Sequence, residues 1–303
     1  MNILVTGASG FLGRNLSNKL TSFKPNKIIL LDSKIADLTL SDSLHQFNDT
    51  KFDKIYHLAC WTQAGDFSIK HAGEEWLINQ QINTNTIKWW YEHQKQAKFI
   101  SMGTSCAYPE NGSYKEETYF EDKPISSLFT YAMSKRMLQN GVESISKQFG
   151  LNYITFVPST LYGPGYSINN KIPHFIFDLI KKFIRYKKYD EEIILWGDGN
   201  QIRELIYVDD FINNMIAIEN LNITNEIFNI GAGIGHTIKH FAKIICQEMN
   251  INFSEIKFDT NAFVGSKSKV LNTEKISKLV NVEQIPLEKG IKNTINDLYT
   301  KVK

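Results

Sequence analysis

The sequence is poor in cysteine and balanced in charge, and both properties disfavour whole classes of protein. Its cysteines, Cys60, Cys106 and Cys246, lie far apart and form no CxxC pair. This spacing indicates neither a disulfide framework nor a metal site built on thiolates. Lys and Arg number 34 against 32 Asp and Glu, so we expect no electrostatic footprint for nucleic acid.

Long apolar runs are also missing. No stretch approaches the roughly 18 consecutive apolar residues of a membrane-spanning helix, and the opening residues MNILVTGASG contain neither a basic leader nor a cleavage site. We therefore expect a cytoplasmic protein in a reducing compartment that contacts no membrane.

The chain does contain enough apolar residues for a large core, since 42% of its 303 residues are hydrophobic. Segments long enough for crossover helices, such as 75–96 and 129–149, separate short apolar runs. These runs are continuous rather than alternating, as in strands buried on both faces, and they occur at 3–5, 27–32, 54–59, 98–103 and 153–159. The alternation predicts an α/β fold with a Rossmann-type doubly wound parallel sheet.

The pattern changes after about residue 160. A Gly/Pro turn, LYGPG, precedes a basic helical stretch and further short strands, and no long linker or repeat divides the chain. We assign residues 1–160 to a dinucleotide-binding domain, with returning segments near 199–231. Residues 161–198 and 232–303 then form a smaller C-terminal substrate-binding region that shares an interface with the first.

A glycine-rich segment follows the first predicted strand and precedes a helical pattern. In this strand–turn–helix context, Gly7 permits a tight turn, Gly10 lets backbone approach a pyrophosphate at the helix N-terminus, and Gly13 lets the helix pack close to the sheet. An ordinary glycine-rich turn is the alternative. The spacing therefore predicts a dinucleotide cofactor, NAD or NADP.

The end of the second predicted strand bears on the choice between these cofactors. Asp32 can accept hydrogen bonds from an adenosine ribose and would repel a 2′-phosphate, which favours NAD. Arg14 and Lys34 are near enough in sequence to contact a phosphate, and a strand-end Asp is often a turn residue. Asp37 and Leu38 are suited to an adenine edge, although an Asp that begins a helix is an equal alternative.

Two residues of the second long helix have a spacing with chemical use. Tyr131 and Lys135 stand at i and i+4, on the same helix face. A phenol has a pKa of about 10, and a neighbouring ammonium stabilises the phenolate and makes the phenol a better proton donor and acceptor. A surface tyrosine beside a lysine is the alternative. Thr104 follows another strand, at the edge where open α/β sheets bind ligands.

These residues carry a resemblance to a known family. The segments TGASGFLG, HLA at 57–59, TSCAYP, YAMSK, LYGPG, WGDGNQIRELIYVDD, FNIG and VGSKSKVLN resemble, in order, those of the extended short-chain dehydrogenase/reductases, the NAD-dependent epimerase/dehydratase family that modifies nucleotide sugars. Within that family they are most similar to the GDP-L-fucose synthases. The resemblance implies a nucleotide-diphosphate sugar as partner and a nucleotide-sugar-binding role for the C-terminal region.

The resemblance also implies roles for individual residues. Thr104 would bond the sugar O4 or carbonyl, Tyr131 would donate or accept a proton, and Lys135 would hold the nicotinamide ribose. Arg203 would grip the diphosphate with its guanidinium fork. Trp196 could cover the base and Ser105 contact the substrate, while the cofactor-binding set would comprise Gly7, Gly10, Phe11, Leu12, Gly13, Asp32, Asp37, Leu38, Leu58, Ala59, Asn79, Tyr131 and Lys135. Asn79 would support Lys135 through backbone or water.

Position 106 bears on the type of reaction. The family's 4,6-dehydratases have a Glu there, so Cys106 disfavours dehydration; in the fucose synthases a cysteine at this place moves protons beside the C4 ketone. An inert buried thiol is the alternative. The second epimerisation acid of the family, a His, aligns with Asn170, and His174 could replace it after a local shift. Thr160 also departs from the family's Asn.

We therefore expect reduction at C4 of a nucleotide-linked keto-deoxysugar, with or without epimerisation at a neighbouring carbon. The alternatives are a 4-epimerase that keeps NAD bound and a non-catalytic nucleotide-binding protein.

Three successive aromatics, Trp89 to Tyr91, cannot all face one core, so we expect another surface to cover the rings that face away from it. Family dimers pair this helix with the Tyr131 helix, which predicts a homodimer; burial of all three in the core is the alternative.

Overall fold

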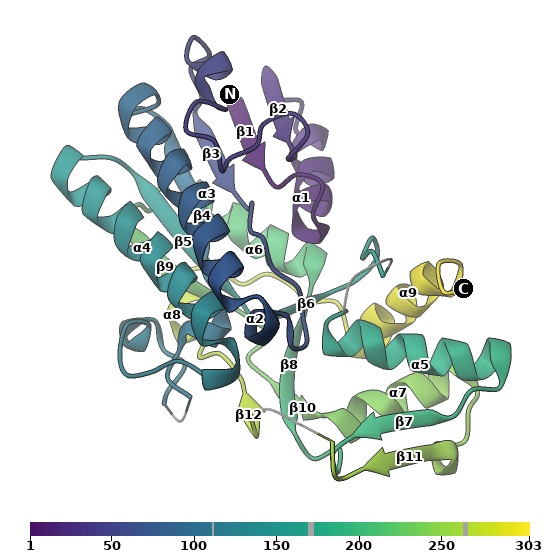
Figure 1. The fold of residues 1–303 in the computed structure, drawn as a ribbon. Helices are drawn as coiled ribbons and strands as arrows, with labels where there is room; N and C mark the ends of the chain where they lie inside the picture. The colour runs from purple at the N-terminus through teal and green to yellow at the C-terminus, as the bar shows by residue number, and fades with distance from the viewer. Residues whose placement is uncertain (111, 169–172, 263–265) are drawn as a thin grey trace.

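The computed structural model describes residues 1–303 except 111, 169–172 and 263–265. Its centre is a parallel sheet of six strands in the order β2-β1-β3-β4-β5-β9 (Figure 1). These strands are β1 (Asn2–Thr6), β2 (Lys27–Leu31), β3 (Lys54–His57), β4 (Lys98–Met102), β5 (Tyr153–Pro158) and β9 (Glu226–Ile230). The Rossmann-type α/β fold predicted from the apolar runs is confirmed.

Helices cover both faces of this sheet, which explains why its strands are continuously apolar. In β1, Ile3 and Val5 pack beneath α1 (Phe11–Ser22) and α6 (Val208–Asn220), whereas Leu4 packs beneath α3 (Ala72–His93) and α4 (Phe129–Phe149). Side chains of a strand alternate between faces, so a strand buried on both sides needs apolar residues at every position.

The second region is built around smaller sheets. Strand β8 (Ile202–Tyr207) lies between β10 (Gly235–Thr237) and β12 (Ser268–Lys269) and also pairs with β6 (Thr160–Tyr162). β7 (Ile193–Trp196) pairs with β11 (Ile256–Asp259). The helices α5 (Phe175–Tyr189), α7 (Ile238–Met249) and α9 (Leu287–Tyr299) share one apolar core with these strands. The short helices α2 (Phe67–Lys70) and α8 (Glu274–Ser277) complete the described α-helices.

Direct contacts join α1 to this second region. Arg14 donates from Nη2 to the Gly165 carbonyl at 2.5 Å, and Asn15 donates to the Pro164 carbonyl at 3.4 Å. Gly165 in turn donates its N–H to Asp297 of α9 at 3.0 Å. The helix that follows the glycine loop is therefore tied to the LYGPG turn.

The three aromatics at the end of α3 correct one of our expectations. Trp89 and Trp90 are both buried in the core between α3, α4 and the sheet. Trp89 donates to the Asn48 side chain at 2.8 Å, Trp90 donates to the Ala97 carbonyl at 2.9 Å, and the Tyr91 ring lies against Phe149. The chain itself covers all three rings, because the preceding loop and the end of α4 close over them, so they give no argument for a partner subunit.

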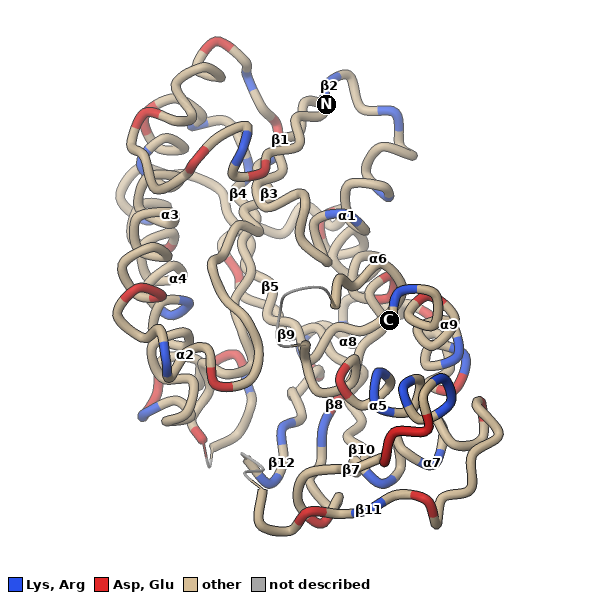
Figure 2. The backbone as a smooth tube through the Cα atoms, turned by 45° about the vertical axis from the view of Figure 1, so that its right-hand side comes forward, with Lys and Arg blue, Asp and Glu red and all other residues tan. Residues whose placement is uncertain are grey.

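The basic stretch of the sequence forms α5, where blue segments gather in Figure 2. Part of this charge is paired within the chain: Arg185 bonds the Glu191 carboxylate, and Lys188 donates to the carbonyls of Tyr299 and Val302. Over the described ranges, none of the helices combines the length and apolarity that crossing a bilayer requires.

Candidate active site at the carboxyl edge of the sheet

The glycine loop between β1 and α1 has the geometry that the sequence predicts. Gly7 has φ +65°, and a Cβ there would stand 2.7 Å from the backbone N of Ala59. A Cβ at Gly13 would collide with the Gly7 carbonyl oxygen. At Gly10, which precedes α1, a Cβ would meet only that same oxygen, at 3.2 Å. The surface above Gly10 at the positive end of α1 is therefore open, and its backbone can approach a phosphate.

The HLA segment lies directly beside this loop. His57, which is buried, contacts the Thr6 hydroxyl through Nδ1 at 3.0 Å and the Asn83 amide oxygen through Nε2 at 3.1 Å. Because the amide oxygen can only accept, Nε2 carries the proton and Nδ1 accepts from Thr6. The Thr6 oxygen accepts in turn from the Ala59 N–H at 3.2 Å. This chain of bonds fixes Leu58 and Ala59 against the glycine loop.

The neutral state of His57 follows from its position. Burial lowers the pKa of His57 to about 4, the Asn83 hydrogen bond opposes that shift, and the nearby Lys135 ammonium adds to it. An imidazolium would lose the acceptor that holds Thr6, so the loop depends on a neutral ring.

At the end of β2, Asp32 serves partly as a turn residue. Its Oδ1 accepts from the backbone N–H groups of Lys34 at 2.9 Å and Ile35 at 3.2 Å. Asp37 is exposed and uses its Oδ1 to bond Thr39, whereas Leu38 is buried. Of the two cations considered as phosphate ligands, Lys34 is exposed and Arg14 donates to the carbonyls of Ser9 and Gly165.

Asn79 of α3 holds the segment that follows Ala59. Its Oδ1 accepts from the Trp61 N–H at 2.8 Å, while its Nδ2 donates to the carbonyls of Trp61 at 2.9 Å and Glu75 at 2.8 Å. The side chain thus clamps backbone next to Cys60, whose thiol shares a hydrogen-bonding interaction with the Lys135 ammonium. Asn79 therefore fixes backbone beside the Cys60–Lys135 pair, and its predicted support of Lys135 stays a prediction.

Tyr131 and Lys135 lie one turn apart on α4, beside Thr104 at the end of β4. Lys135 and Thr104 are buried, Tyr131 is half-buried, and the phenol and the Thr104 hydroxyl interact through a side-chain hydrogen bond. Thr104 also caps the short helical turn Ser105–Ala107 by accepting from the Cys106 N–H at 3.2 Å. The structure therefore brings the three residues together at the edge where β1, β3 and β4 end.

The protonation of Tyr131 differs from our expectation. Burial raises its pKa well above the ordinary phenol value, the nearby Cys60 and Cys106 thiols add to the rise, and the Thr104 hydrogen bond opposes it. A neighbouring ammonium alone would have lowered the pKa of Tyr131. Desolvation outweighs that effect, so the phenol of the free protein is a proton donor rather than a phenolate.

Cys106 is half-buried and directly contacts a lysine from the second region. The Lys269 ammonium donates to its Sγ over 2.8 Å. His174, which precedes α5 and is exposed, lies near this lysine, and desolvation and the Lys269 charge both lower the His174 pKa. Asn170 lies outside the described residues, as does Ile172 of the aligned dipeptide, so the predicted replacement of the family His has no structural description.

Trp196 and Arg203 line one pocket of about 160 Å³ between β7, β8 and α5. Trp196 is 61% exposed, with the Lys182 ammonium 5.4 Å from its ring centroid. Burial lowers the pKa of Arg203, and Tyr114 and Cys106 oppose that shift, which places the guanidinium near the Cys106 thiol. The predicted nucleotide-binding side chains therefore border the predicted reaction site.

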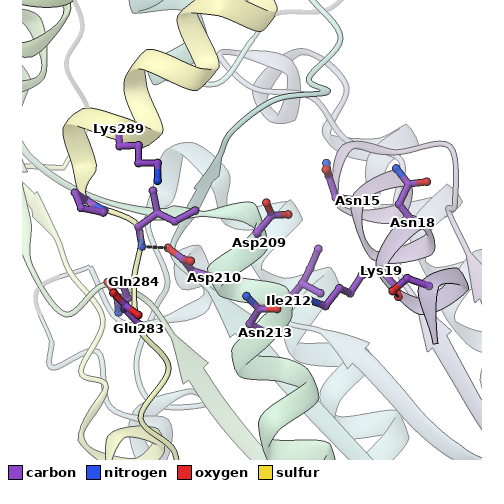
Figure 3. Close-up of a pocket in the computed structure, with 13 residues that line it drawn as sticks. Asn15, Asn18, Lys19, Asp209, Asp210, Ile212, Asn213, Glu283, Gln284 and Lys289 are labelled. Carbon is purple, nitrogen blue, oxygen red and sulfur yellow. Dashed lines mark hydrogen bonds between the residues drawn. The ribbon is translucent and has the colours of Figure 1, made fainter.

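A larger cavity, of about 670 Å³, lies away from these residues. Figure 3 shows it between α1, α6 and the segment before α9, where Asp210 accepts from the Ile285 N–H at 2.9 Å. Its lining contains none of the site residues that the sequence predicts. We therefore place the candidate site at the carboxyl edge of the sheet, where the chemistry-bearing side chains converge, rather than in the larger space.

One residue and one contact of this neighbourhood escaped the sequence-based reasoning. Glu75 is buried and acts electrostatically on Cys60, with the Thr62 hydroxyl donating to its Oε1 at 2.8 Å. Nothing in the sequence marked it, because an acidic residue in the first turn of a helix is usually solvated. The direct contact of Lys269 with Cys106 was missed as well, since the two are far apart in the chain.

The fold and this edge have the arrangement of a dinucleotide-binding α/β oxidoreductase. A family model described as the NAD dependent epimerase/dehydratase family matches residues 3–231. The chain belongs to that family, as the sequence motifs predicted, and it is an NAD(P)-dependent enzyme.

Individual relatives match nearly the whole chain. GDP-L-fucose synthase 1 of Arabidopsis thaliana is 26% identical, with 99% of this chain and 93% of that protein covered. GDP-L-colitose synthase of Yersinia pseudotuberculosis is also 26% identical, covering 97% and 96%. Among solved structures, a GDP-L-fucose synthetase from Naegleria fowleri bound to NADP has a TM-score of 0.85 at 24% identity, covering 99% and 94%. The structural match supports the fold.

Proposed function

We propose that this enzyme reduces the C4 ketone of a GDP-linked keto-deoxysugar. The observation that carries the proposal is the convergence of Thr104, Tyr131 and Lys135 at the carboxyl edge of the sheet, opposite the open surface at Gly10. Relatives named as GDP-L-fucose and GDP-L-colitose synthases support the same substrate class.

The residues suggest how the proton is handled. A nicotinamide cofactor, when bound, supplies the hydride for a ketone carbon. Thr104 bonds the ketone oxygen and, with Tyr131, fixes its position. The protonated phenol then gives its proton to that oxygen, and Lys135, fixed beside Cys60, orients the cofactor ribose and stabilises the phenolate left behind.

We infer that the bound cofactor is NAD. Asp32 supports this preference because its carboxylate stands at the end of β2, where it accepts from two backbone N–H groups and adds negative charge. A 2′-phosphate near that carboxylate would be repelled. Asp32→Asn should narrow the preference for NADH over NADPH, measured as the ratio of kcat/KM values, while Asp42→Asn, on the loop beyond, should leave the ratio unchanged.

The nucleotide would lie between the two regions of the molecule. Arg203 offers its guanidinium fork to the diphosphate, and Trp196 offers an exposed ring to the base from the same pocket. GDP-, UDP- and dTDP-linked 4-keto-6-deoxysugars should be compared. A preference of tenfold or more for GDP in kcat/KM is expected, and equal rates would contradict the choice of base.

The decisive experiment incubates purified protein with a GDP-linked 4-keto-6-deoxyhexose and NADH or NADPH and follows absorbance at the nicotinamide band. Consumption that depends on both sugar and enzyme is expected. No consumption with any of the three nucleotide sugars would reject the proposal. Nuclear magnetic resonance of the product would then show whether C4 alone has changed.

One observation favours a second function. If the carboxylate of Asp32 holds NAD tightly, the protein could oxidise C4 and return the hydride to the other face of a rotated ketone, as a 4-epimerase. Mass spectrometry of the cofactor released by denaturation separates the two functions. Stoichiometric NAD, with turnover of a GDP-hexose that needs no added cofactor, would favour the epimerase.

We also propose a homodimer formed through the outer faces of α3 and α4. Supporting residues are the exposed Trp76 and Leu77 of α3 and Met137 of α4, since α3 and α4 pack side by side. Light scattering should give twice the chain mass at micromolar concentration. Trp76→Glu should yield monomers, whereas Phe23→Glu, on an equally exposed ring at the end of α1, should not. We also propose a cytoplasmic location, because the three cysteines carry free thiols, as is usual in a reducing compartment.

A further inference from the structure

We propose that Lys269 is the proton-transfer partner of Cys106, so that the pair exchanges the substrate proton on the carbon next to the C4 ketone. The proposal rests on the function proposed above. Its basis is the 2.8 Å contact between the Lys269 ammonium and the Cys106 sulfur, made between residues from the two regions of the molecule.

The backbone positions both partners. Lys269 is in β12, whose parallel pairing with β8 sets it beside Arg203. Cys106 is in the turn Ser105–Ala107, where its N–H donates to the Thr104 oxygen at 3.2 Å. Cys106 is therefore held two residues after Thr104, whose hydroxyl bonds the ketone oxygen in the proposed function.

Cationic groups lie close to this sulfur. Over the described residues, no carboxylate lies within ion-pairing distance of Lys269, so its charge is directed at the sulfur. His174 also lies near Lys269. The titratable groups that act electrostatically with Cys106 are the Arg203 guanidinium and the phenols of Tyr114, Tyr119 and Tyr131. The neighbours of the sulfur therefore include two cations, Lys269 and Arg203, and none of these groups is a carboxylate.

The step that the pair performs balances without an oxidant or reductant. The Cys106 thiolate takes a proton from the carbon beside C4; the C–H bond breaks, an S–H bond forms, and the electron pair becomes an enolate whose oxygen lies at Thr104 and Tyr131. The Lys269 ammonium releases one proton to solvent, and the resulting amine takes the proton from sulfur, which restores both the thiolate and the ammonium. Reprotonation of carbon then brings in a solvent proton.

The arrangement gives Cys106 a titratable partner, although this chain has the amide Asn170 at the position that aligns with the family's His. An amide neither donates nor recovers a proton at neutral pH, whereas a lysine beside a thiolate can do both.

A first experiment needs no substrate. Cys106 is alkylated with iodoacetamide at pH 7 in the intact protein, and peptide mass spectrometry separates it from Cys60 and Cys246. Lys269→Gln should slow the reaction about tenfold, because the thiolate loses its adjacent cation. Lys269→Arg should retain most of the rate, and Lys267→Gln, an exposed lysine two residues away, should match the native protein. Equal rates in Lys269→Gln and native protein would overturn the pairing.

A second experiment follows the proton itself. The ketosugar is reduced in D₂O with the cofactor, and the deuterium content of the product is measured by mass spectrometry. Native enzyme should incorporate deuterium on carbon, and the Lys267→Gln variant should do the same. Lys269→Gln and Lys269→Arg should form product with at least tenfold less deuterium per turnover, since arginine keeps the charge but not the proton transfer. Undiminished deuterium in both variants overturns the proposal. Absence of product with native enzyme rejects the proposed reduction instead, and the alkylation result still stands.

Discussion

The two halves of the candidate site are held in different ways. On the sheet side, the glycine loop, the HLA segment, Asn79 and Lys135 are fixed by buried hydrogen bonds and by close approach of backbone. On the side of the second region, Trp196 is mostly exposed and Lys269 comes from a strand of two residues. The difference indicates that the residues proposed for hydride transfer are preorganised by rigid elements, whereas short strands and loops place Lys269 and the residues proposed to bind the nucleotide.

The sheet side is tested most directly at Tyr131. Tyr131→Phe should reduce kcat by about 10²–10⁴-fold, because in the proposed function the phenol donates the proton to the ketone oxygen. Cofactor affinity, measured by fluorescence titration, should change less than threefold. Tyr189→Phe, at an exposed position on α5, is the matched control and should retain full activity. Full activity in Tyr131→Phe would place the chemistry elsewhere.

The close approach at the glycine loop should be nearly as sensitive. Gly13→Ala forces a Cβ into the Gly7 carbonyl oxygen, so we expect a loss of about 2 kcal/mol in the free energy of unfolding. Cofactor affinity should fall tenfold or more. The control is Gly73→Ala in α3, where a Cβ meets nothing within 4 Å and should be neutral or slightly stabilising. Urea denaturation and cofactor titration of both variants test the contrast.

The buried His57 predicts how stability depends on pH. Its pKa is about 4 in the folded protein and about 6.5 in an unfolded chain, so acid favours the unfolded state, which binds the proton first. The contribution of the neutral ring to the free energy of unfolding is about 3 kcal/mol. It is fully present above pH 6.5 and is lost as the pH falls towards 4. Urea denaturation at pH 7.5 and 4.5 measures it. In His57→Gln, the loss of unfolding free energy between pH 7.5 and 4.5 should become smaller by this amount. An unchanged loss would exclude His57 as its source.

On the substrate side, smaller and purely binding effects are expected. Arg203→Met should raise KM for the nucleotide sugar by about tenfold to a hundredfold, since a charged hydrogen bond is worth about 1.5–3 kcal/mol, while kcat changes little. Arg185→Met on α5 should leave KM unchanged. A fall in kcat with constant KM would show that Arg203 acts in the transition state, and would weaken the division between the two halves.

The sequence allowed the sheet side to be predicted in detail, for physical reasons. Continuous apolar runs such as 98–103 mark strands buried on both faces, and Gly7 and Gly13 mark contacts that only glycine allows. The aromatics from Trp89 to Tyr91 were interpreted wrongly because periodicity shows which way a helical side chain points but not which loop covers it. The direction of the Tyr131 pKa was wrong as well, because burial depends on elements distant in sequence.

The contact between Lys269 and Cys106 marks the limit of such reasoning. It joins residues on β12 and at the end of β4 whose meeting depends on how the second region closes over the sheet. Local sequence patterns do not predict this contact between distant segments, whereas the proximity of Tyr131 and Lys135 follows from helical spacing alone.

The first turns of α3 carry two unrelated tasks on opposite sides. Asn79 faces inward and clamps the backbone at Trp61, while Trp76 and Leu77 face outward, exposed at the surface. Deleting or remodelling this stretch to test the proposed dimer would therefore also release the loop that carries Cys60. Variants that test the proposed dimer should change outward side chains singly and leave the helical backbone intact.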